Sequence, residues 1–358
     1  MKILVLTSAL LFSAIILFSC KQSPVNPEDN VPPGKRNYVW SIDSINYDSI
    51  PGTIQLESIW GSSATDIWGA NGDAPDVRDC LWHYDGVKWS RATEGTPITE
   101  FTGNKVVYSL WGSAQNDVWA FGRKINFGIL SAFMMHFDGN QWFDATPSNI
   151  SSLSINLYCI YATAADNIWV GGYEYTLHYN GSAWNSYKVA DSIIVGSITG
   201  NSRYHYLTTY SPWNDTSLTY IYKFNEGSFN KIDWAPHYPV KFGLGLWAQD
   251  QILNSFTNGV ISTSINADGT IDVNGWHRLF TTNTYFGLNA YCVQSSKNVF
   301  TVGQYNLVYH FNGTDWARID INVPGHTVDP SALFWGVWTD GNEVFISDIE
   351  NGIIYHGR

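Results

Sequence analysis

The chain has 358 residues, of which 44% are hydrophobic and 14% are charged, and its formal net charge is -12 at pH 7. This length and composition are sufficient for a globular core. The acidic balance argues against nucleic acid and anionic lipid surfaces as partners, because both require clustered Lys and Arg.

The first twenty residues have the features of an export signal. Lys2 supplies a positive start, an apolar run follows, and the small residue Ser19 directly precedes Cys20. Residues 17–20 resemble the signal of bacterial lipoproteins, which implies cleavage after a signal peptide of residues 1–19 and acylation of Cys20. An ordinary secretory signal or an uncleaved anchor is the alternative. The resemblance implies a protein of the bacterial cell envelope that is anchored in the outer membrane by lipid on Cys20.

Residues 20–36 are expected to form the lipidated cysteine and a flexible tether. The segment KQSPVNPEDNVPPGKR, which follows Cys20, contains four prolines and shows no apolar periodicity. Such a composition favours an extended, mobile chain. Residues 37–358 are expected to form one domain, because closed β architectures hold this many residues as a single unit.

From Ser58 onward the sequence repeats itself. SIWGSSATDIWGANGDAPDVRDCLWHYDGVKWSRAT begins at Ser58, SLWGSAQNDVWAFGR and MMHFDGNQWFDAT repeat it from Ser109, and CIYATAADNIWVGG and TLHYNGSAWNSYK repeat it from Cys159. A period of about 40 to 50 residues indicates a propeller, a solenoid or an array. Each unit reads as four short strands rich in Trp, Tyr, Ile and Val, with DG, NG or EG at the last hairpin turn. Four strands make one propeller blade.

Six complete units and a partial seventh can be counted. Their first and fourth strands are centred on Trp60 and Trp89, Trp111 and Trp142, Tyr161 and Trp184, Thr199 and Phe229, Trp247 and Trp276, and Gln294 and Trp316. The seventh unit starts at Val337 and ends before a fourth strand, whereas NYVWSIDSI at residues 37–45 places Trp40 as a fourth strand would. The fold class is therefore all-β, a β-propeller of seven four-stranded blades closed by the N-terminal strand. Six or eight blades remain open, because units four and five are degenerate.

The repeat is similar to that of bacterial proteins with sialidase-like or photosystem-assembly-factor-like propellers, whose units read approximately WAVG, then ILH, then DG and W. The counterparts here are WGANG and LWHYDG, WAFG and MMHFDG, WVGG and TLHYNG, and FTVG and VYHFNG. This resemblance implies the fold of residues 37–358 and transfers no catalytic residue. HYDGVKW also loosely resembles the Asp-box turn of sialidase-type propellers, although Gly86 directly follows Asp85 where the Asp-box has a residue between.

Sialidase-type enzymes hold a carboxylate with a central triad of arginines. Three arginines of this chain lie two residues after a fourth-strand tryptophan, which places them on the outer rim: Arg91, Arg278 and Arg318. They are therefore not expected to converge.

Aromatic residues and histidines occur mostly at repeat positions. Thirteen of the 17 tryptophans do so and are expected in the core; Trp82, Trp213, Trp234 and Trp335 do not, and Trp213 is the best exposed stacking candidate. Five histidines share one third-strand position, so they cannot converge on one metal ion and are expected to be hydrogen-bonded structural residues: His83, His136, His178, His310 and His356.

Three cysteines follow Cys20. Cys159 and Cys292 are expected on equivalent strands of different blades, too far apart for a disulfide and buried as thiols. Cys80 lies beside a loop and is the thiol to test for reactivity.

The connections predict two unlike faces. Turns between first and second strands and between third and fourth strands are short, and we call their side the short-turn face. Second-to-third loops and interblade connections are long and irregular, and we call their side the long-loop face. Function in β scaffolds usually lies on such loops. The candidate ligand-binding residues are Asp73, Arg78, Arg123, Tyr173, Tyr175, Tyr210, Trp213 and Tyr305.

The predicted function is a non-catalytic binding or scaffolding module for a protein or a glycan, acting as a monomer through the long-loop face. No catalytic residue, metal, cofactor or nucleic acid is expected, since no P-loop, nucleophile elbow or dinucleotide motif occurs. The alternative is a carbohydrate-active enzyme, a glycosidase or a glycosyl transferase, with carboxylates in the axial pocket. Such carboxylates are defined by their separation in space and not by sequence spacing.

Overall fold

The computed structural model describes residues 32–45, 54–72, 74, 79–92, 104–200, 203–211, 220–232, 242–248, 251–256, 259–282 and 287–358. The expected signal peptide, Cys20 and the first part of the tether lie outside these ranges. Within them, no helix has the length and apolar character needed to span a membrane. The helix α1 (Ser148–Ser151) is a single turn between two blades.

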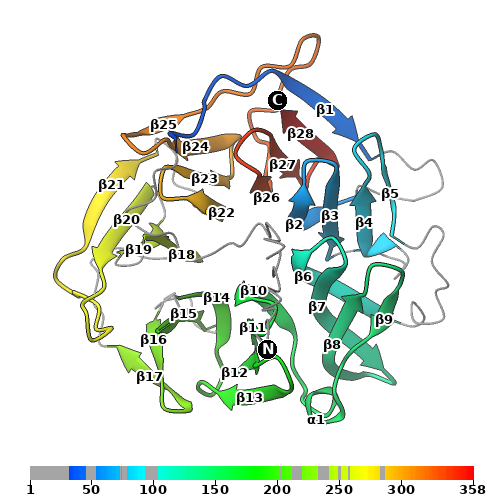
Figure 1. Cartoon of the computed structure of the whole chain (residues 1–358), viewed down its shortest axis with the longest axis vertical. Coiled ribbons are helices and arrows are strands. Elements are labelled where there is room, and N and C mark those ends of the chain that lie inside the picture. The colour runs from blue at the N-terminus through cyan, green and yellow to red at the C-terminus, as the bar shows by residue number, and fades with distance from the viewer. Residues whose placement is uncertain are drawn as a thin grey trace, which may run out of the picture.

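Seven four-stranded antiparallel sheets surround a central axis (Figure 1), which confirms the all-β propeller and its seven blades. The strands of the first three blades are β2 (Leu56–Ser63), β3 (Asp66–Asn71), β4 (Leu81–Tyr84), β5 (Trp89–Arg91), β6 (Asn104–Ala114), β7 (Asp117–Asn126), β8 (Ile129–Phe137), β9 (Trp142–Asp144), β10 (Leu157–Ala164), β11 (Asn167–Gly172), β12 (Tyr175–Tyr179) and β13 (Trp184–Lys188). In each blade the strands follow one another from the axis outward.

The next three blades have the same order, including the two that are degenerate in sequence. Their strands are β14 (Ile194–Gly200), β15 (His205–Tyr210), β16 (Tyr220–Asn225), β17 (Ser228–Ile232), β18 (Phe242–Ala248), β19 (Gln251–Phe256), β20 (Gly259–Ser264), β21 (His277–Thr281), β22 (Leu288–Ser295), β23 (Asn298–Gly303), β24 (Leu307–Phe311) and β25 (Trp316–Arg318). The count of seven therefore holds although units four and five diverge.

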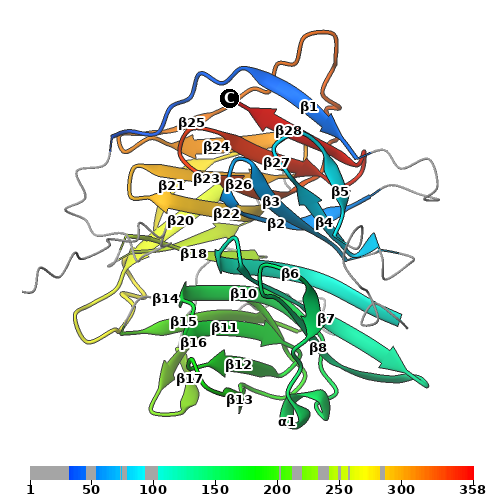
Figure 2. The same cartoon turned by 45° about the vertical axis from the view of Figure 1, so that its right-hand side comes forward.

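The two ends of the propeller meet in the seventh blade. It contains β26 (Phe334–Thr339), β27 (Val344–Asp348) and β28 (Ile353–Gly357), and β1 (Trp40–Ser44) is its outer strand. Figures 1 and 2 show β1 alongside β28, with Trp40 opposite Gly357. The innermost strands β26 and β2 are also in contact, which closes the ring.

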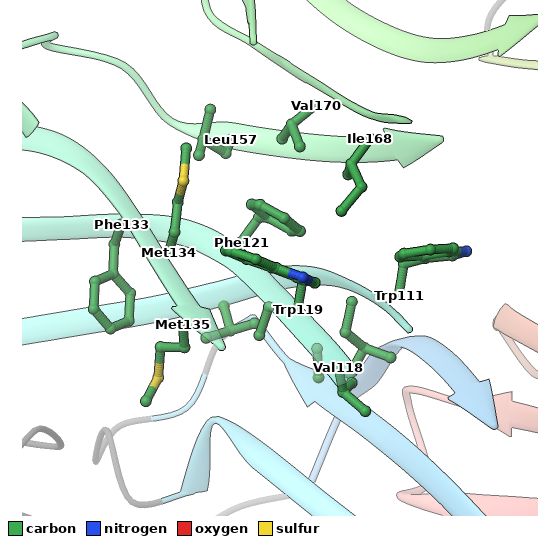
Figure 3. Close-up of a cluster of buried hydrophobic side chains, with 14 of the residues drawn as sticks. Trp111, Val118, Trp119, Phe121, Phe133, Met134, Met135, Leu157, Ile168 and Val170 are labelled. Carbon is green, nitrogen blue, oxygen red and sulfur yellow. The ribbon is translucent and has the colours of Figure 1, made fainter. Parts of the chain in front are cut away.

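The core lies between neighbouring blades, where side chains from facing sheets interdigitate. Phe121 and Met134 of the second blade meet Leu157 and Val170 of the third (Figure 3). Ten of the thirteen repeat-position tryptophans are buried, as expected of residues that fill the space between sheets: Trp40, Trp60, Trp68, Trp89, Trp111, Trp119, Trp142, Trp169, Trp184 and Trp338.

Two residues outside the repeat pattern behave in opposite ways. Trp82 is completely buried, and its indole N–H donates to the Asp79 carbonyl oxygen at 2.8 Å. Trp335 is 38% exposed. Trp213 and Trp234 lie outside the described residues.

The three cysteines that the structure describes, Cys80, Cys159 and Cys292, are free thiols. Cys159 and Cys292 lie on the innermost strands of the third and sixth blades, and burial raises their pKa values to about 12 and about 11. Cys80 lies beside the loop, as expected, but it is completely buried, so the thiol chosen for a reactivity test is not accessible to solvent.

The closing strand generates the first prediction. Trp40 is 4% exposed and belongs to the cluster that joins the sixth and seventh blades. Trp40→Ala should lower the free energy of unfolding by about 3–5 kcal/mol, because it leaves a cavity under the strand that closes the ring. Urea unfolding measures the loss. Val39→Ala is the matched control, since Val39 is 74% exposed, and it should change stability by less than about 0.5 kcal/mol. Equal effects of the two substitutions would contradict the role of β1.

Candidate functional site

All seven innermost strands contain a β-bulge at the same place. In each, one residue near the start of the strand is skipped in the pairing with the second strand of its blade. A bulged residue is left out of the ladder, and its side chain takes a new direction. We call the skipped residues the bulge ring; they are Glu57, Tyr108, Tyr158, Gly196, Gly243, Asn289 and Trp335.

The bulge ring lies on the long-loop face. Each innermost strand enters its blade from an interblade connection, and the skipped residue is close to that entry point. The innermost strands surround the central axis (Figure 1). The ring therefore marks the long-loop end of the axis, where a propeller brings residues from every blade together.

Aromatic and charged side chains meet on one arc of the bulge ring. The rings of Tyr108 and Tyr158 are 5.4 Å apart, although they belong to different blades. The Arg123 guanidinium carbon lies 5.6 Å from the centroid of the Tyr108 ring, a cation–π arrangement. Both Glu57 and Tyr108 pack against Gly72, where a Cβ atom would collide with each of them. The arc thus combines one carboxylate, two phenols and one guanidinium.

In the fourth blade a residue of the second strand extends this arc. The bulge residue is Gly196, which has no side chain, and the ring of Tyr210 from β15 lies 3.1 Å from where a Cβ atom on Gly196 would be. Burial raises the pKa of Tyr210 to about 12, and neighbouring Tyr158 contributes to the increase. Tyr210 therefore stays a neutral hydrogen-bonding group at physiological pH.

The opposite arc is more open. The Asn289 side-chain amide donates to the Phe334 carbonyl oxygen of the next blade at 2.9 Å. That bond holds the bulge beside Trp335, whose indole is 38% exposed. An exposed tryptophan on a fixed backbone is a ready contact surface.

The structure unites some of the predicted site residues and separates others. Arg123 and Tyr210 belong to the arc described above. Tyr173 bridges to Ile194 at the start of the fourth blade, close to Tyr210 in the same ladder, and Tyr175 begins β12 opposite Lys188.

Tyr305 occupies the turn between β23 and β24 of the sixth blade, with a φ of 58° and 39% exposure. The adjacent Asn306 donates its backbone N–H to Ala332. Asp73, Arg78 and Trp213 lie outside the described residues. Of the bulge residues, the sequence singled out only Trp335, as a tryptophan outside the repeat positions. The signal for the whole set is variability, since the position reads Glu, Tyr, Tyr, Gly, Gly, Asn and Trp inside an otherwise regular strand.

The five repeat histidines form the structural arrangement that was expected. Each ring stacks on an aromatic residue of the second strand: Trp68–His83 (4.1 Å), Trp119–His136 (4.1 Å), Trp169–His178 (4.0 Å), Phe300–His310 (4.2 Å) and Phe345–His356 (3.8 Å). Each Nε2 donates to a side-chain oxygen at the start of that strand, on Asp66 (2.6 Å), Asp117 (2.6 Å), Asn167 (2.8 Å), Asn298 (2.7 Å) and Glu343 (2.5 Å). Among the described residues, no group of three or more His, Cys, Asp or Glu is arranged to hold a metal ion.

Comparisons with known proteins give the fold but no family. No protein-family model matches the chain, and no curated protein matches it in sequence. A structure of YCF48 bound to D1 peptide is similar, with a TM-score of 0.63 and 13% identity over 91% of this chain and 97% of that chain.

Two further solved structures are similar. Virginiamycin B lyase from Staphylococcus aureus, an inactive variant with quinupristin, has a TM-score of 0.61 and 13% identity over 88% of this chain and 98% of that chain. The WD40 propeller domain of Doa1 has a TM-score of 0.58 and 9% identity over 89% of this chain and 97% of that chain. At these identities the likeness establishes the propeller architecture alone.

The histidine arrangement predicts a specific pH dependence of stability. Burial, with a smaller contribution from the Arg36 guanidinium, lowers the pKa of His310 to about 4. The unfolded chain takes up this proton near pH 6.5 and the folded chain does not, so His310 supports folding above pH 6.5 and this support is lost as the pH falls. Between pH 7 and pH 5 the free energy of unfolding should fall by about 1–2 kcal/mol through His310.

Urea unfolding at the two pH values tests this directly. His310→Gln should reduce this pH dependence without removing it, because burial also lowers the pKa of His205 to about 4. An unchanged slope in His310→Gln would show that His310 does not carry the effect.

Proposed function

We propose that this chain is a non-catalytic module that binds a segment of a partner protein across the bulge ring on the long-loop face. The observation that carries the proposal is the recurrence of the bulge in all seven innermost strands. A bulge costs ladder pairing, and bulges at barrel rims typically redirect side chains toward a functional surface. The bulges recur at the long-loop end of all seven innermost strands, and five of the seven skipped residues carry a side chain.

The composition of this surface supports a protein partner. Tyr108, Tyr158, Tyr210 and Trp335 supply aromatic area, and Arg123 supplies a cation. Tyr, Trp and Arg are the residues that dominate binding energy at protein interfaces. The similar structure of YCF48 was solved with a D1 peptide bound, which supports a peptide segment over a glycan as the ligand.

The same residues favour binding over glycosidase or glycosyl-transfer chemistry. Glycoside hydrolysis normally uses two carboxyl groups about 5 to 9.5 Å apart. Glu57 is the single acidic residue among the seven of the bulge ring. A surface of this composition can hold a ligand without providing the acid and base pair of a glycosidase.

We further propose that the module is attached to the bacterial cell envelope, as a monomer, by lipid on Cys20. In this proposal residues 1–19 are the signal peptide, residues 20–36 the lipidated cysteine and the tether, and residues 37–358 the propeller. The end of the expected tether is not free, because Gly34 and Arg36 bind the sixth blade. The support is the apolar run that stops at Cys20 in the sequence. An outer-membrane anchor would place the bulge ring near proteins of the envelope.

The binding proposal predicts site-specific crosslinking in cells. A photo-crosslinking amino acid at Trp335 should form one discrete adduct with a protein, because the side chain is exposed beside the bulge ring. The same amino acid at Val39, which is 74% exposed on the outer wall of the seventh blade, should not. Tyr158→Ala should lower the Trp335 adduct yield at least about tenfold, the loss typical of an interface hot spot.

Val87→Ala is the matched control for Tyr158→Ala. Val87 is 86% exposed in the turn between β4 and β5, on the short-turn face, and its truncation should leave the adduct unchanged. Circular dichroism verifies that both variants are folded. Equal crosslinking at Trp335 and Val39 would refute the bulge ring as the binding surface. An adduct with carbohydrate instead of protein would show that the partner is a glycan.

The anchor predicts the behaviour of a cysteine variant. Cys20→Ala should move the protein from the membrane fraction to the soluble fraction and abolish incorporation of a labelled fatty acid, since no other thiol is placed for acylation by the signal. Ser23→Ala should fractionate like the natural chain. Membrane retention of Cys20→Ala without label would overturn the lipid anchor and leave the bulge-ring proposal intact.

A further inference from the structure

A second surface of interest lies on the short-turn face, away from the bulge ring. A cavity of about 410 Å³ opens between the first and second blades. We call it the interblade groove. Its floor belongs to the first blade and includes Asp66, Trp68, His83 and Ser90. Its rim is formed by turns of the second blade.

The floor of the interblade groove is one of the repeated histidine arrangements. His83 stacks on Trp68 and donates to Asp66. In the second blade the same arrangement is partly covered by its own outer strand, because Phe143 lies opposite His136 with the rings 5.3 Å apart. Ser90 takes the place of Phe143 opposite His83. With the smaller residue, 28% of the His83 side chain is exposed, compared with 21% of the His136 side chain.

In the sixth blade, a peptide already occupies the equivalent position. Gly34 donates its backbone N–H to the Lys297 carbonyl oxygen at 2.9 Å. A Cβ atom on Gly34 would be 2.7 Å from both Asn298 Oδ1 and His310 Nε2, so the glycine lies directly on the hydrogen-bonded pair. Under this segment His310 is completely buried. The chain therefore contains an example of what such a groove accepts: an extended backbone with glycine at the histidine.

A charged contact fixes that segment two residues later. The Arg36 guanidinium pairs with the Asp315 carboxylate at 3.0 Å and donates to the His310 carbonyl oxygen at 3.0 Å. Asp315 directly precedes the fourth-strand residue Trp316. In the first blade the residue directly before the fourth-strand tryptophan is Lys88, which is exposed. The position that binds Arg36 in the sixth blade, Asp315, is therefore occupied by the positively charged Lys88 in the first blade.

We propose that the interblade groove binds an extended peptide segment of a partner protein, with glycine over the His83–Asp66 pair and an acidic residue two positions later facing Lys88. The bound peptide would have the backbone geometry of residues 34–36 on the sixth blade, with a negatively charged residue where Arg36 is positive. A second copy of this chain would present Arg36 to Lys88, and like charges are disfavoured there. This site is independent of the bulge ring.

Two synthetic peptides test the proposal on the purified full chain by fluorescence anisotropy. One is Pro-Pro-Gly-Lys-Arg-Asn-Tyr, the sequence of residues 32–38, and the other has Glu in place of Arg. The acidic peptide should bind about fivefold more tightly, as expected for one exposed ion pair. Lys88→Glu should reverse the order of the two peptides. Replacing the peptide glycine by alanine should abolish binding, because its Cβ would meet the histidine.

A substitution at Ser90 tests whether the peptide binds in the interblade groove, because it introduces the phenylalanine found at the equivalent position of the second blade. Ser90→Phe should close the groove and remove binding of the acidic peptide, with thermal unfolding used to show that the variant is folded. In the natural chain, the NMR signals of His83 should shift on peptide addition, while those of His136, under Phe143, should not. Lys88 is exposed, so Lys88→Glu tests the site even where Ser90→Phe fails to fold.

Each contrary result is decisive. Equal affinity of both peptides for the natural chain and for Lys88→Glu, or a shift at His136 instead of His83, would place binding elsewhere. Tighter binding of the basic peptide to the natural chain would favour a second copy of this chain over a partner of opposite charge. Loss of peptide binding has no bearing on crosslinking at Trp335, so failure here and failure of the proposed function remain distinguishable.

Discussion

The antiparallel pairing of β1 with β28 is the constraint on which the structure depends. Seven sheets can pack face to face around an axis only if the last has its outer strand, and the chain has to return from its other end to supply it. Trp40 packs between the sixth and seventh blades, and β26 contacts β2, so every sheet has a neighbour on both faces. The seven bulges recur because the first and second strands pair in the same way within each blade.

The fold separates what is repeated from what is specific. Several contacts recur from blade to blade and stabilise the sheets. They are the stacked histidines, the buried tryptophans and the hydrogen-bonded turns. The bulge-ring residue varies among the blades, and the coverings of the short-turn grooves differ among the first, second and sixth blades. A bulged residue is outside the ladder, so Glu57 or Tyr108 could be exchanged during evolution without changing how the strands pair. Recognition can thus vary on a constant scaffold.

The sequence was sufficient for the architecture but not for the sites. Repetition of WGS, H[YF][DN]G and W predicted the blades, and the position of Trp40 predicted the closure. Bulges could not be predicted, because a bulge is a relation between two paired strands and Tyr108 looks like any strand residue in isolation. The burial of Cys80 could not be predicted from its position beside a loop. The contact between Gly34 and His310 joins residues too distant in sequence for any spacing rule to connect them.

The segment that crosses the sixth blade has a mechanical consequence. A pull on the amino-terminal side of Pro32 reaches Gly34 and Arg36 before it reaches β1, so the sixth blade receives the load ahead of the seventh. The Arg36–Asp315 pair and the backbone bond at Lys297 would have to yield before β1 could be peeled from β28. The strand that completes the ring is therefore shielded from tension at the end of the chain where a tether would act.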